Sequence, residues 1–194
     1  MPYQLLEQHI KKHVEFSGEE LKTFCDHFHL KKVMKKQLLL RYGTVCQFEG
    51  FVTKGCFRLF TIDHEGNENV LYFAAKDWWV TDIDSFTNQT PAFLSIQALE
   101  DSEVLLVNKS DKELLYERMP KVEKLFRIMT QKTLVSLQRR LIRNHSLTAE
   151  ERYQHFISTY PEIAQKLTNL QIAAYLGITH EFVSKIRKKI SKGQ

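Results

Sequence analysis

The chain has 194 residues, 43% of them hydrophobic, which is enough for one domain or two small domains with a buried core. No apolar run has the length of a membrane span, and the N-terminus lacks a signal-peptide core, so we expect a cytoplasmic protein without a membrane partner. Residues 1–108 hold 11 Lys and Arg against 15 Asp and Glu, whereas residues 109–194 hold 17 against 8, which indicates a polyanionic partner for the second half.

The N-terminal part of the chain predicts helices followed by short strands. Ser17 and Glu20 form a capping box, and apolar residues follow them at helical spacing. From about residue 31 to 108, short β-branched and aromatic runs alternate with turn residues. The segment DHEGN at 63–67 predicts a hairpin loop with Gly66 in the left-handed conformation. Together these features predict an α+β fold with an N-terminal antiparallel β-roll of the jelly-roll type.

After Asn108 the helical period returns. A short helix is expected at 110–117 and a long one at about 121–144. One apolar face of the long helix can cover the roll, and the other can meet the same helix of a second copy. The alternative is that both faces are buried within one chain. The residues predicted at a dimer interface are Ile128, Leu134, Val135, Leu141 and Ile142.

The last part of the chain predicts a helix-turn-helix. Thr148 and Glu151 form a capping box for a helix through about Thr159, and Pro161 opens the approach to residues 169–188. In that window Ile172, Leu176, Ile178, Val183 and Ile186 are the apolar positions. Thr168 with Gln171 caps the first helix, Gly177 lies at the bend, and Thr179 caps the second. The alternative is an ordinary pair of packed helices.

The second helix presents a polar face, opposite to the face on which Val183, Ile186 and Ile190 are expected to pack inward. Glu181 can accept a hydrogen bond from cytosine, and Lys185 can donate to guanine. The basic residues that follow, Lys192 among them, are suited to phosphates, although a solvated basic face is the alternative. The predicted DNA-binding residues are Thr168, Asn169, Thr179, His180, Glu181, Ser184, Lys185, Arg187, Lys188 and Lys189.

This order of a roll, a long helix and a helix-turn-helix resembles the Crp/Fnr family of bacterial transcription regulators over nearly the whole chain. The stretches that carry the resemblance are residues 50–86, the long helix, TAEERY at 148–153 and LTNLQIAAYLGITHEFVSKIRKK at 167–189. The family's recognition helix commonly begins Ser/Thr-Arg-Glu-Thr-Val-x-Arg, and here Glu181 is kept while His180 and Lys185 replace the two arginines. Lysine lacks the planar fork of arginine, so the operator sequence is expected to differ.

The resemblance implies a domain organisation and a set of partners. It implies a sensor roll at 1–120, a dimerisation helix at 121–145 and a DNA-binding domain at 146–194. The implied partners are double-stranded DNA with a palindromic operator, a second copy of the chain, RNA polymerase and a small-molecule effector. The family's β-hairpin wing after the recognition helix is expected to be short or missing, because the sequence continues only to Gln194.

The effector cannot be assigned from the sequence. In the family, cyclic AMP needs an arginine for its phosphate, and this chain has no arginine between Arg58 and Arg118, so we expect cyclic nucleotide binding to be absent or much altered. Asp82 and Asp84 either lie near the ribose position or are exposed acids in a loop. Trp78 and Trp79 either pack in the core and on the surface or line an aromatic pocket between the roll and the long helix. The candidate effector residues are Tyr72, Trp78, Trp79, Asp82 and Asp84.

Other chemistry is not indicated by the sequence. Cys25, Cys46 and Cys56 match no zinc or cluster spacing and are expected to be reduced thiols, and no cofactor or metal set is identified. The leading hypothesis is a dimeric, sequence-specific DNA-binding regulator. The alternative is a ligand-binding sensor or interaction module whose helix-turn-helix no longer binds DNA. An enzyme is the weakest hypothesis, because no phosphate loop or nucleophile motif is present.

Overall fold

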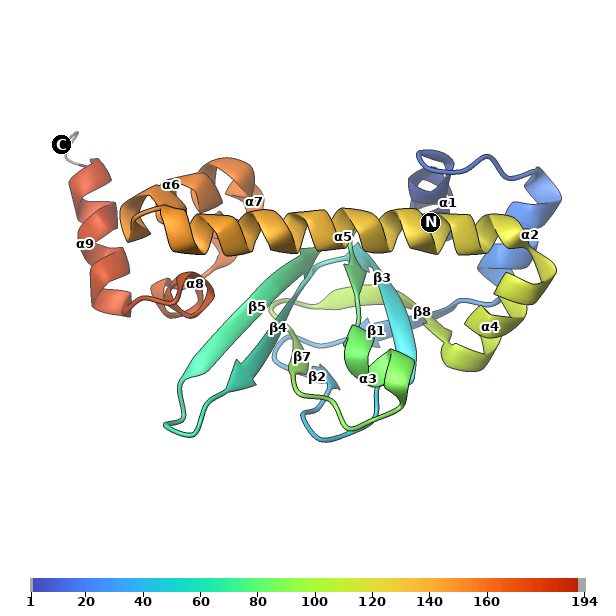
Figure 1. The fold of residues 1–194 in the computed structure, drawn as a ribbon, viewed down its shortest axis with the longest axis horizontal. Helices are drawn as coiled ribbons and strands as arrows, with labels where there is room; N and C mark the ends of the chain where they lie inside the picture. Colours follow the sequence, from blue (N-terminus) through green and yellow to red (C-terminus); the bar gives the residue numbers. More distant parts are fainter. Residues whose placement is uncertain (1, 192–194) are drawn as a thin grey trace. The chain divides into compact units, whose positions relative to one another are not determined.

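The computed structural model describes residues 2–191 (Figure 1). Its helices are α1 (Pro2–Lys11), α2 (Gly18–Asp26), α3 (Ile83–Asn88), α4 (Lys109–Arg118), α5 (Pro120–Ser146), α6 (Ala149–Thr159), α7 (Pro161–Lys166), α8 (Asn169–Leu176) and α9 (His180–Ser191). Its strands are β1 (His29–Val33), β2 (Leu38–Leu40), β3 (Phe48–Lys54), β4 (Cys56–Ile62), β5 (Glu68–Ala75), β6 (Trp79–Val80), β7 (Ser95–Ala98) and β8 (Ser102–Asn108). The predicted short and long helices correspond to α4 and α5, each longer than expected.

The strands form two four-stranded sheets, with the orders β1-β8-β3-β6 and β2-β7-β4-β5. In the first sheet β8 pairs antiparallel with both β1 and β3. Phe51 of β3 lies opposite Leu105 of β8, and both side chains are fully buried. The predicted α+β fold with an antiparallel roll is therefore confirmed.

The local signals in the sequence act where they were expected. The Ser17–Glu20 and Thr148–Glu151 capping boxes are both complete, with side chain and backbone bonded in each direction. Gly66 has a φ of +86°, which closes the loop between β4 and β5, and its amide donates to the carbonyl of Asp63 at 3.0 Å. These signals are local, so they fix the ends of elements independently of the rest of the chain.

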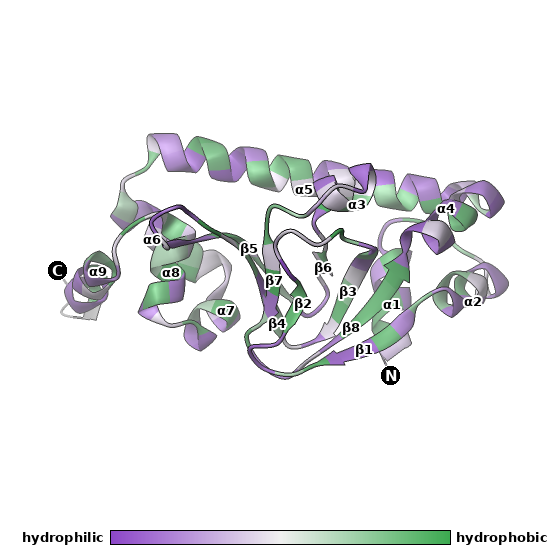
Figure 2. Ribbon diagram, turned by 90° about the horizontal axis from the view of Figure 1, so that it is seen from below, coloured by the Kyte–Doolittle hydropathy of each residue, from purple (hydrophilic) through white to green (hydrophobic). Residues whose placement is uncertain are grey.

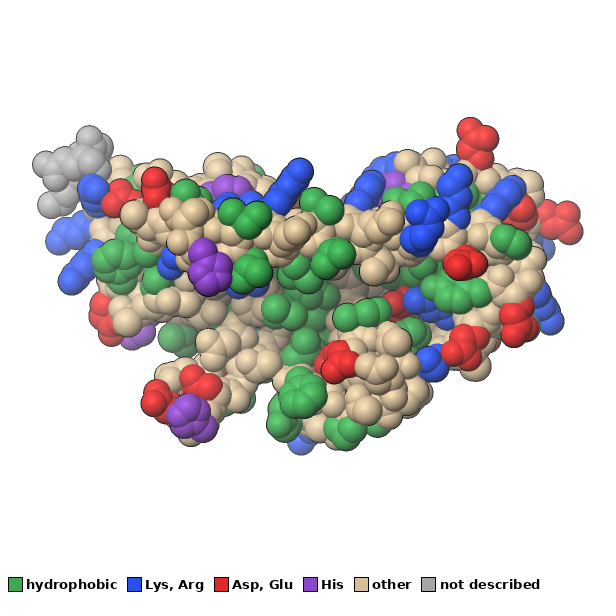
Figure 3. Space-filling model, viewed as in Figure 1, with side chains coloured by type: hydrophobic (Ala, Val, Ile, Leu, Met, Phe, Trp, Pro, Cys, Tyr) green, Lys and Arg blue, Asp and Glu red, His purple; other side chains and the backbone are tan. Residues whose placement is uncertain are grey.

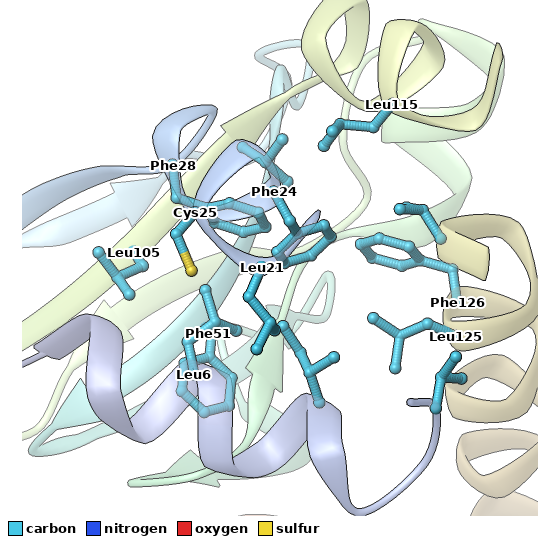
Figure 4. Packing of buried hydrophobic residues seen from close by; sticks show 14 residues of the cluster. Leu6, Leu21, Phe24, Cys25, Phe28, Phe51, Leu105, Leu115, Leu125 and Phe126 are labelled. Atoms are coloured by element: carbon cyan, nitrogen blue, oxygen red, sulfur yellow. The ribbon is translucent and has the colours of Figure 1, made fainter. Parts of the chain in front are cut away.

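A cluster of buried side chains from α1, α2, the first sheet, α4 and the start of α5 forms the main core (Figure 4). Phe24, Phe51, Leu115 and Leu125 are fully buried in it. Burial of a large apolar side chain stabilises the fold by about 1.5–3 kcal/mol. The N-terminal part of α5 therefore packs on the roll through the same core that contains side chains of α1 and α2.

One charged pair is buried beside this core. Lys112 Nζ of α4 lies 2.6 Å from Glu49 Oε2 of β3, and both residues are buried. The ammonium also lies 4.1 Å from the ring centroid of Phe126 and 5.2 Å from that of Phe86. Burial lowers the pKa of Lys112, and the charge of Glu49 opposes that shift.

The three cysteines are buried and form no disulfide, as the sequence predicts. Burial raises the pKa of the Cys25 thiol to about 12. A thiol with so high a pKa is not ionised near neutral pH and packs as a small apolar side chain.

The chain divides into two compact units. The roll unit contains residues 1–59 and 74–133, and the C-terminal unit contains residues 60–73 and 134–194. Residues 60–73 are the hairpin made by the end of β4 and most of β5, so a piece of the roll sequence belongs to the same unit as α6–α9. None of the described helices is both long and apolar enough to cross a membrane.

Candidate nucleic-acid interface and sensor residues

The helices α8 and α9 and the short turn between them have the geometry that the sequence predicts. The Thr168–Gln171 capping box begins α8, and Gly177 ends it with a φ of +66°. The Thr179 hydroxyl accepts from the Phe182 amide at 3.3 Å at the start of α9. Gly177 takes a left-handed conformation that a residue with a Cβ adopts only at a cost of roughly 1–2 kcal/mol.

The inner faces of the two helices pack on each other and on α6. Ile172, Leu176, Val183 and Ile186 are buried, as predicted. Ile190 was predicted on the same inward face, but it is 40% exposed, which corrects that prediction. It lies in the last turn of α9, which ends at Ser191.

The outer face of α9 is polar and exposed, and Figure 2 shows mainly hydrophilic residues on this helix. His180, Glu181, Ser184, Lys185 and Lys188 are all exposed. Hydrogen bonding of the Glu181 carboxylate to its own backbone amide, and to Thr179, lowers the pKa of that carboxyl. Glu181 is thus a charged acceptor at the N-terminus of the helix, with His180 Nε2 at 3.0 Å from its Oε1.

Six of the predicted contact residues make hydrogen bonds or ion pairs within the protein. The Arg187 Nε donates to the Tyr153 hydroxyl at 2.9 Å, which fixes α9 to α6. Lys189 Nζ pairs with the Glu150 carboxylate at 2.9 and 3.0 Å. The Asn169 side-chain amide donates to Ser184 Oγ at 2.9 Å, which links the two helices of the pair. Thr168 and Thr179 serve as helix caps, and Lys192 lies outside the described residues.

The sequence analysis missed the contacts by which α5 and the hairpin at residues 60–73 pack against α8. Arg140 of α5 donates to the carbonyls of Leu71, Val70 and Tyr175, the last at 2.8 Å, and stacks 4.2 Å from the ring centroid of Tyr175. Phe73 of β5 lies 5.5 Å from the same ring. Only the three-dimensional structure brings hairpin and helix together, because residues 70–73 and 175 carry no pairing signal in the sequence.

The predicted effector residues do not form one set. Asp82 is only 5% exposed and accepts from the Ser85 amide as the N-cap of α3, so the expectation of an exposed loop acid is wrong for it. Its other oxygen, Oδ2, is buried without a hydrogen-bond partner in the described structure. Asp84 is exposed and accepts from Asn88 at 2.6 Å. The helix α3, which is only six residues long, was not predicted from the sequence.

The two tryptophans differ in their surroundings. The Trp79 ring lies 5.4 Å from that of Phe51 and 5.3 Å from that of Phe126, and its Nε1 donates to His9 Nε2 at 3.3 Å. Trp79 is therefore packed against the core, which was one of the two alternatives for it. Trp78 is half-buried in the roll unit, whereas Tyr72 belongs to the C-terminal unit.

The residues predicted at a dimer interface also separate into two groups. Ile128 is partly buried and packs against the core cluster. Leu134, Val135, Leu141 and Ile142 are 63, 43, 58 and 60% exposed, and we call them the α5 stripe. Apolar side chains are visible along this part of the long helix in Figure 3.

No group of three or more His, Cys, Asp or Glu side chains within residues 2–191 is arranged to hold a metal ion. Residues 30–118 match the family model of the cyclic nucleotide-binding domain. A comparison with curated proteins found no match.

Several solved structures share this fold, and two of the following three are described as regulators. The c-di-GMP-responsive global regulator CLP of Xanthomonas campestris is 16% identical, with a TM-score of 0.74 over 91% of this chain and 93% of that one. FixK2 of Bradyrhizobium japonicum is 19% identical, with a TM-score of 0.75 over 86% of each chain. A protein of Eubacterium rectale described as a Crp/Fnr-family regulator is 15% identical, with a TM-score of 0.69 over 92% of this chain and 85% of that one. Residues 30–118 thus match the cyclic nucleotide-binding domain model, and the chain shares its fold with these structures, which confirms the predicted resemblance.

Proposed function

We propose that this chain is a homodimeric transcription regulator of the Crp/Fnr type that binds double-stranded DNA through α9 and senses an effector other than cyclic AMP. The observation that carries the proposal is the set of exposed polar side chains along the outer face of α9. Glu181 and Lys185 lie one helical turn apart on a helix whose opposite face is buried. A recognition helix packs on its own domain through one face and presents polar side chains to the major groove on the other.

The side chains of α9 divide into base-reading and positioning roles. Glu181 accepts from a cytosine amino group, and Lys185 donates to guanine O6 and N7. Lys188 and Lys189 contact phosphates, for which Lys189 exchanges its Glu150 partner for the DNA backbone. Arg187 acts through Tyr153 by holding the helix in place, so it is a positioning residue in this proposal.

The α5 stripe supports the dimer. It is a row of four large apolar side chains that no described residue of the same chain covers well. Heptad spacing relates Leu134 to Leu141 and Val135 to Ile142, which suits a parallel pair of helices. Two copies then present two α9 helices to half-sites about 34 Å apart, in keeping with a palindromic operator.

The roll supports an effector other than cyclic AMP. The cations next to α3 already have partners: Lys109 Nζ donates to the Thr87 carbonyl at 3.1 Å, and Lys112 pairs with Glu49. Asp82 is buried with one unpartnered carboxylate oxygen. A group that donates a hydrogen bond satisfies that oxygen, whereas a phosphate meets repulsion there. We therefore expect no detectable heat on titration with cyclic AMP, and native mass spectrometry of the purified protein tests for another occupant.

The proposed function is tested by a mobility shift on the protein's own upstream region. Glu181→Ala and Lys185→Ala each weaken specific binding by about 1–3 kcal/mol and relax the preference for one base pair. Their matched controls are Glu117→Ala and Lys124→Ala, which remove the same charges from exposed positions of the roll unit. Equal binding by all four variants would refute the assigned reading face. Absence of DNA binding together with a specific small-molecule ligand would favour the interaction-module alternative.

A further inference from the structure

A second basic site lies inside the C-terminal unit, away from the outer face of α9. A pocket between α5, α6 and α8 is lined by Arg140, Arg143, Arg152 and His155, with Tyr160 and Tyr175 among its aromatic walls. It has a volume of about 20 Å³ and opens to solvent. That volume admits about one or two atoms of the size of a water oxygen, so an oxyanion inserts only part of itself from the open side, and no nucleobase or sugar fits inside.

The charges around this pocket are of one sign. Among the described residues, no Asp or Glu lines it, while three guanidinium groups do. Burial is the main cause that lowers the pKa of Arg140, and the nearby Arg143 lowers it further. Positive groups brought together without a carboxylate repel one another unless an anion joins them.

Backbone carbonyls satisfy only part of this donor set. Arg140 donates to three carbonyls, and the Nη atoms of Arg152 donate to those of Leu147 at 3.1 Å and of Leu176 at 3.4 Å. Arg152 Nε is buried without a partner in the described structure. The guanidinium of Arg143 makes no hydrogen bond or ion pair with any other residue in the range 2–191. Buried donors are normally satisfied, so unused donors in one pocket point to a missing acceptor.

The donors that remain suit a compact oxyanion. Guanidinium groups bind phosphate oxygens through charge-assisted hydrogen bonds, often two at a time. Tyr175 lines the pocket, and burial raises its pKa, so its phenol stays protonated and adds no negative charge there. We propose that this pocket binds a phosphate group, either inorganic phosphate or a phosphate of the DNA backbone.

A phosphate bound in this pocket lies next to the end of α8, close in sequence to the start of the proposed recognition helix α9. Arg152 reaches the carbonyl of Leu176, the last residue of α8, and Gly177 and α9 follow directly. A bound phosphate neutralises the arginines and stabilises the junction of α5, α6 and α8. The site therefore goes beyond the proposed function, although the version with a DNA phosphate rests on that function.

Arg143→Gln is the test variant, because the Arg143 guanidinium has no partner whose loss would disturb the fold. Arg139→Gln, at a neighbouring exposed position of α5, is the charge-matched control. In the first arm, sodium phosphate replaces sodium chloride at constant ionic strength, and the melting temperature of each full-length variant is compared with its own value in chloride. Wild type and Arg139→Gln should be stabilised by phosphate, whereas Arg143→Gln should bind it about tenfold more weakly.

In the second arm, binding of a DNA duplex is measured over a series of salt concentrations. If the DNA backbone supplies the phosphate, Arg143→Gln lowers the slope of log K against log salt by about one relative to Arg139→Gln. If free phosphate is the ligand, only the first arm separates the variants. If the two variants behave alike in both arms, the pocket is not a phosphate site. Failure of the wild type to bind DNA would overturn the proposed function alone, since the first arm needs no DNA.

Discussion

The two halves of α5 have a similar share of apolar residues, yet they are used differently. In the first half, Val122, Leu125 and Phe126 are buried in the core of the roll unit. In the second half, the α5 stripe is largely exposed. Figure 2 shows hydrophobic and hydrophilic residues alternating along the whole helix, so hydropathy does not separate the halves. The difference teaches that an amphipathic pattern predicts a buried face without saying whether the cover comes from the same chain.

The largest effect is expected from the first half. Phe126→Ala removes a buried ring that contacts Trp79 and lies next to the Lys112 ammonium. We expect the free energy of unfolding to fall by about 3–5 kcal/mol, measured by urea denaturation. Phe126→Leu keeps most of the volume and should cost clearly less. If Phe126→Ala lowers the free energy of unfolding by no more than a substitution at an exposed position, this half of α5 is not part of the core.

The buried pair beside Phe126 tests whether charge in the first half is required. Lys112→Met leaves the Glu49 carboxylate buried without its cation, so we expect a loss of about 3 kcal/mol in unfolding free energy. The double variant Lys112→Met with Glu49→Leu removes both charges and should recover most of that loss. If the double variant is as unstable as the single one, the pair contributes packing and not charge compensation.

The second half should respond in the opposite way. Leu134→Glu combined with Leu141→Glu places charges in the α5 stripe, which is exposed within one chain. We expect little change in the stability of the isolated chain but at least about a hundredfold weaker dimerisation, measured by analytical ultracentrifugation. Ser136→Glu, at an exposed position on another face of the helix, is the control. Unaltered dimerisation in the double variant would place the interface elsewhere.

The same contrast explains which features of the fold could be predicted from the sequence. Capping boxes at Ser17, Thr148 and Thr168, and the left-handed Gly177, depend on neighbouring residues, so the sequence predicts them correctly. The fold class follows from periodicity for the same reason. The exposed-acid alternative for Asp82 and the inward prediction for Ile190 were wrong, because residue type and helical spacing do not say which side chains the rest of the fold covers.

The candidate site shows the same division. The exposed positions of Glu181 and Lys185 follow from helical spacing around the buried Val183 and Ile186. The use of Arg187 as a partner of Tyr153 does not, because these residues are 34 positions apart. The arginines of the phosphate pocket likewise belong to two helices, and only their meeting in space makes them a site.

The smallest expected effect concerns pH and again distinguishes the first half of α5. His9 is packed beneath it, with Nδ1 at 2.8 Å from Asp77 Oδ1 and Nε2 accepting from Trp79, which itself contacts Phe126. Burial is the main cause that lowers the pKa of His9 from 6.5, although Asp77 opposes it. Burial also lowers the pKa of His13.

A lowered pKa means that the unfolded chain binds protons more readily than the folded chain. Stability is therefore full above about pH 6.5 and is lost as the pH falls from that value through the folded pKa of His9. Urea unfolding at pH 7.5 and pH 5.5 measures this loss, and His9→Gln should reduce it while His13 retains a part. The glutamates introduced by Leu134→Glu and Leu141→Glu have an ordinary pKa of about 4.3 and stay ionised between pH 7.5 and 5.5, so that variant should keep the pH dependence that His9→Gln reduces. If His9→Gln leaves the loss of unfolding free energy between pH 7.5 and pH 5.5 unchanged, protonation of His9 is not the cause of that loss.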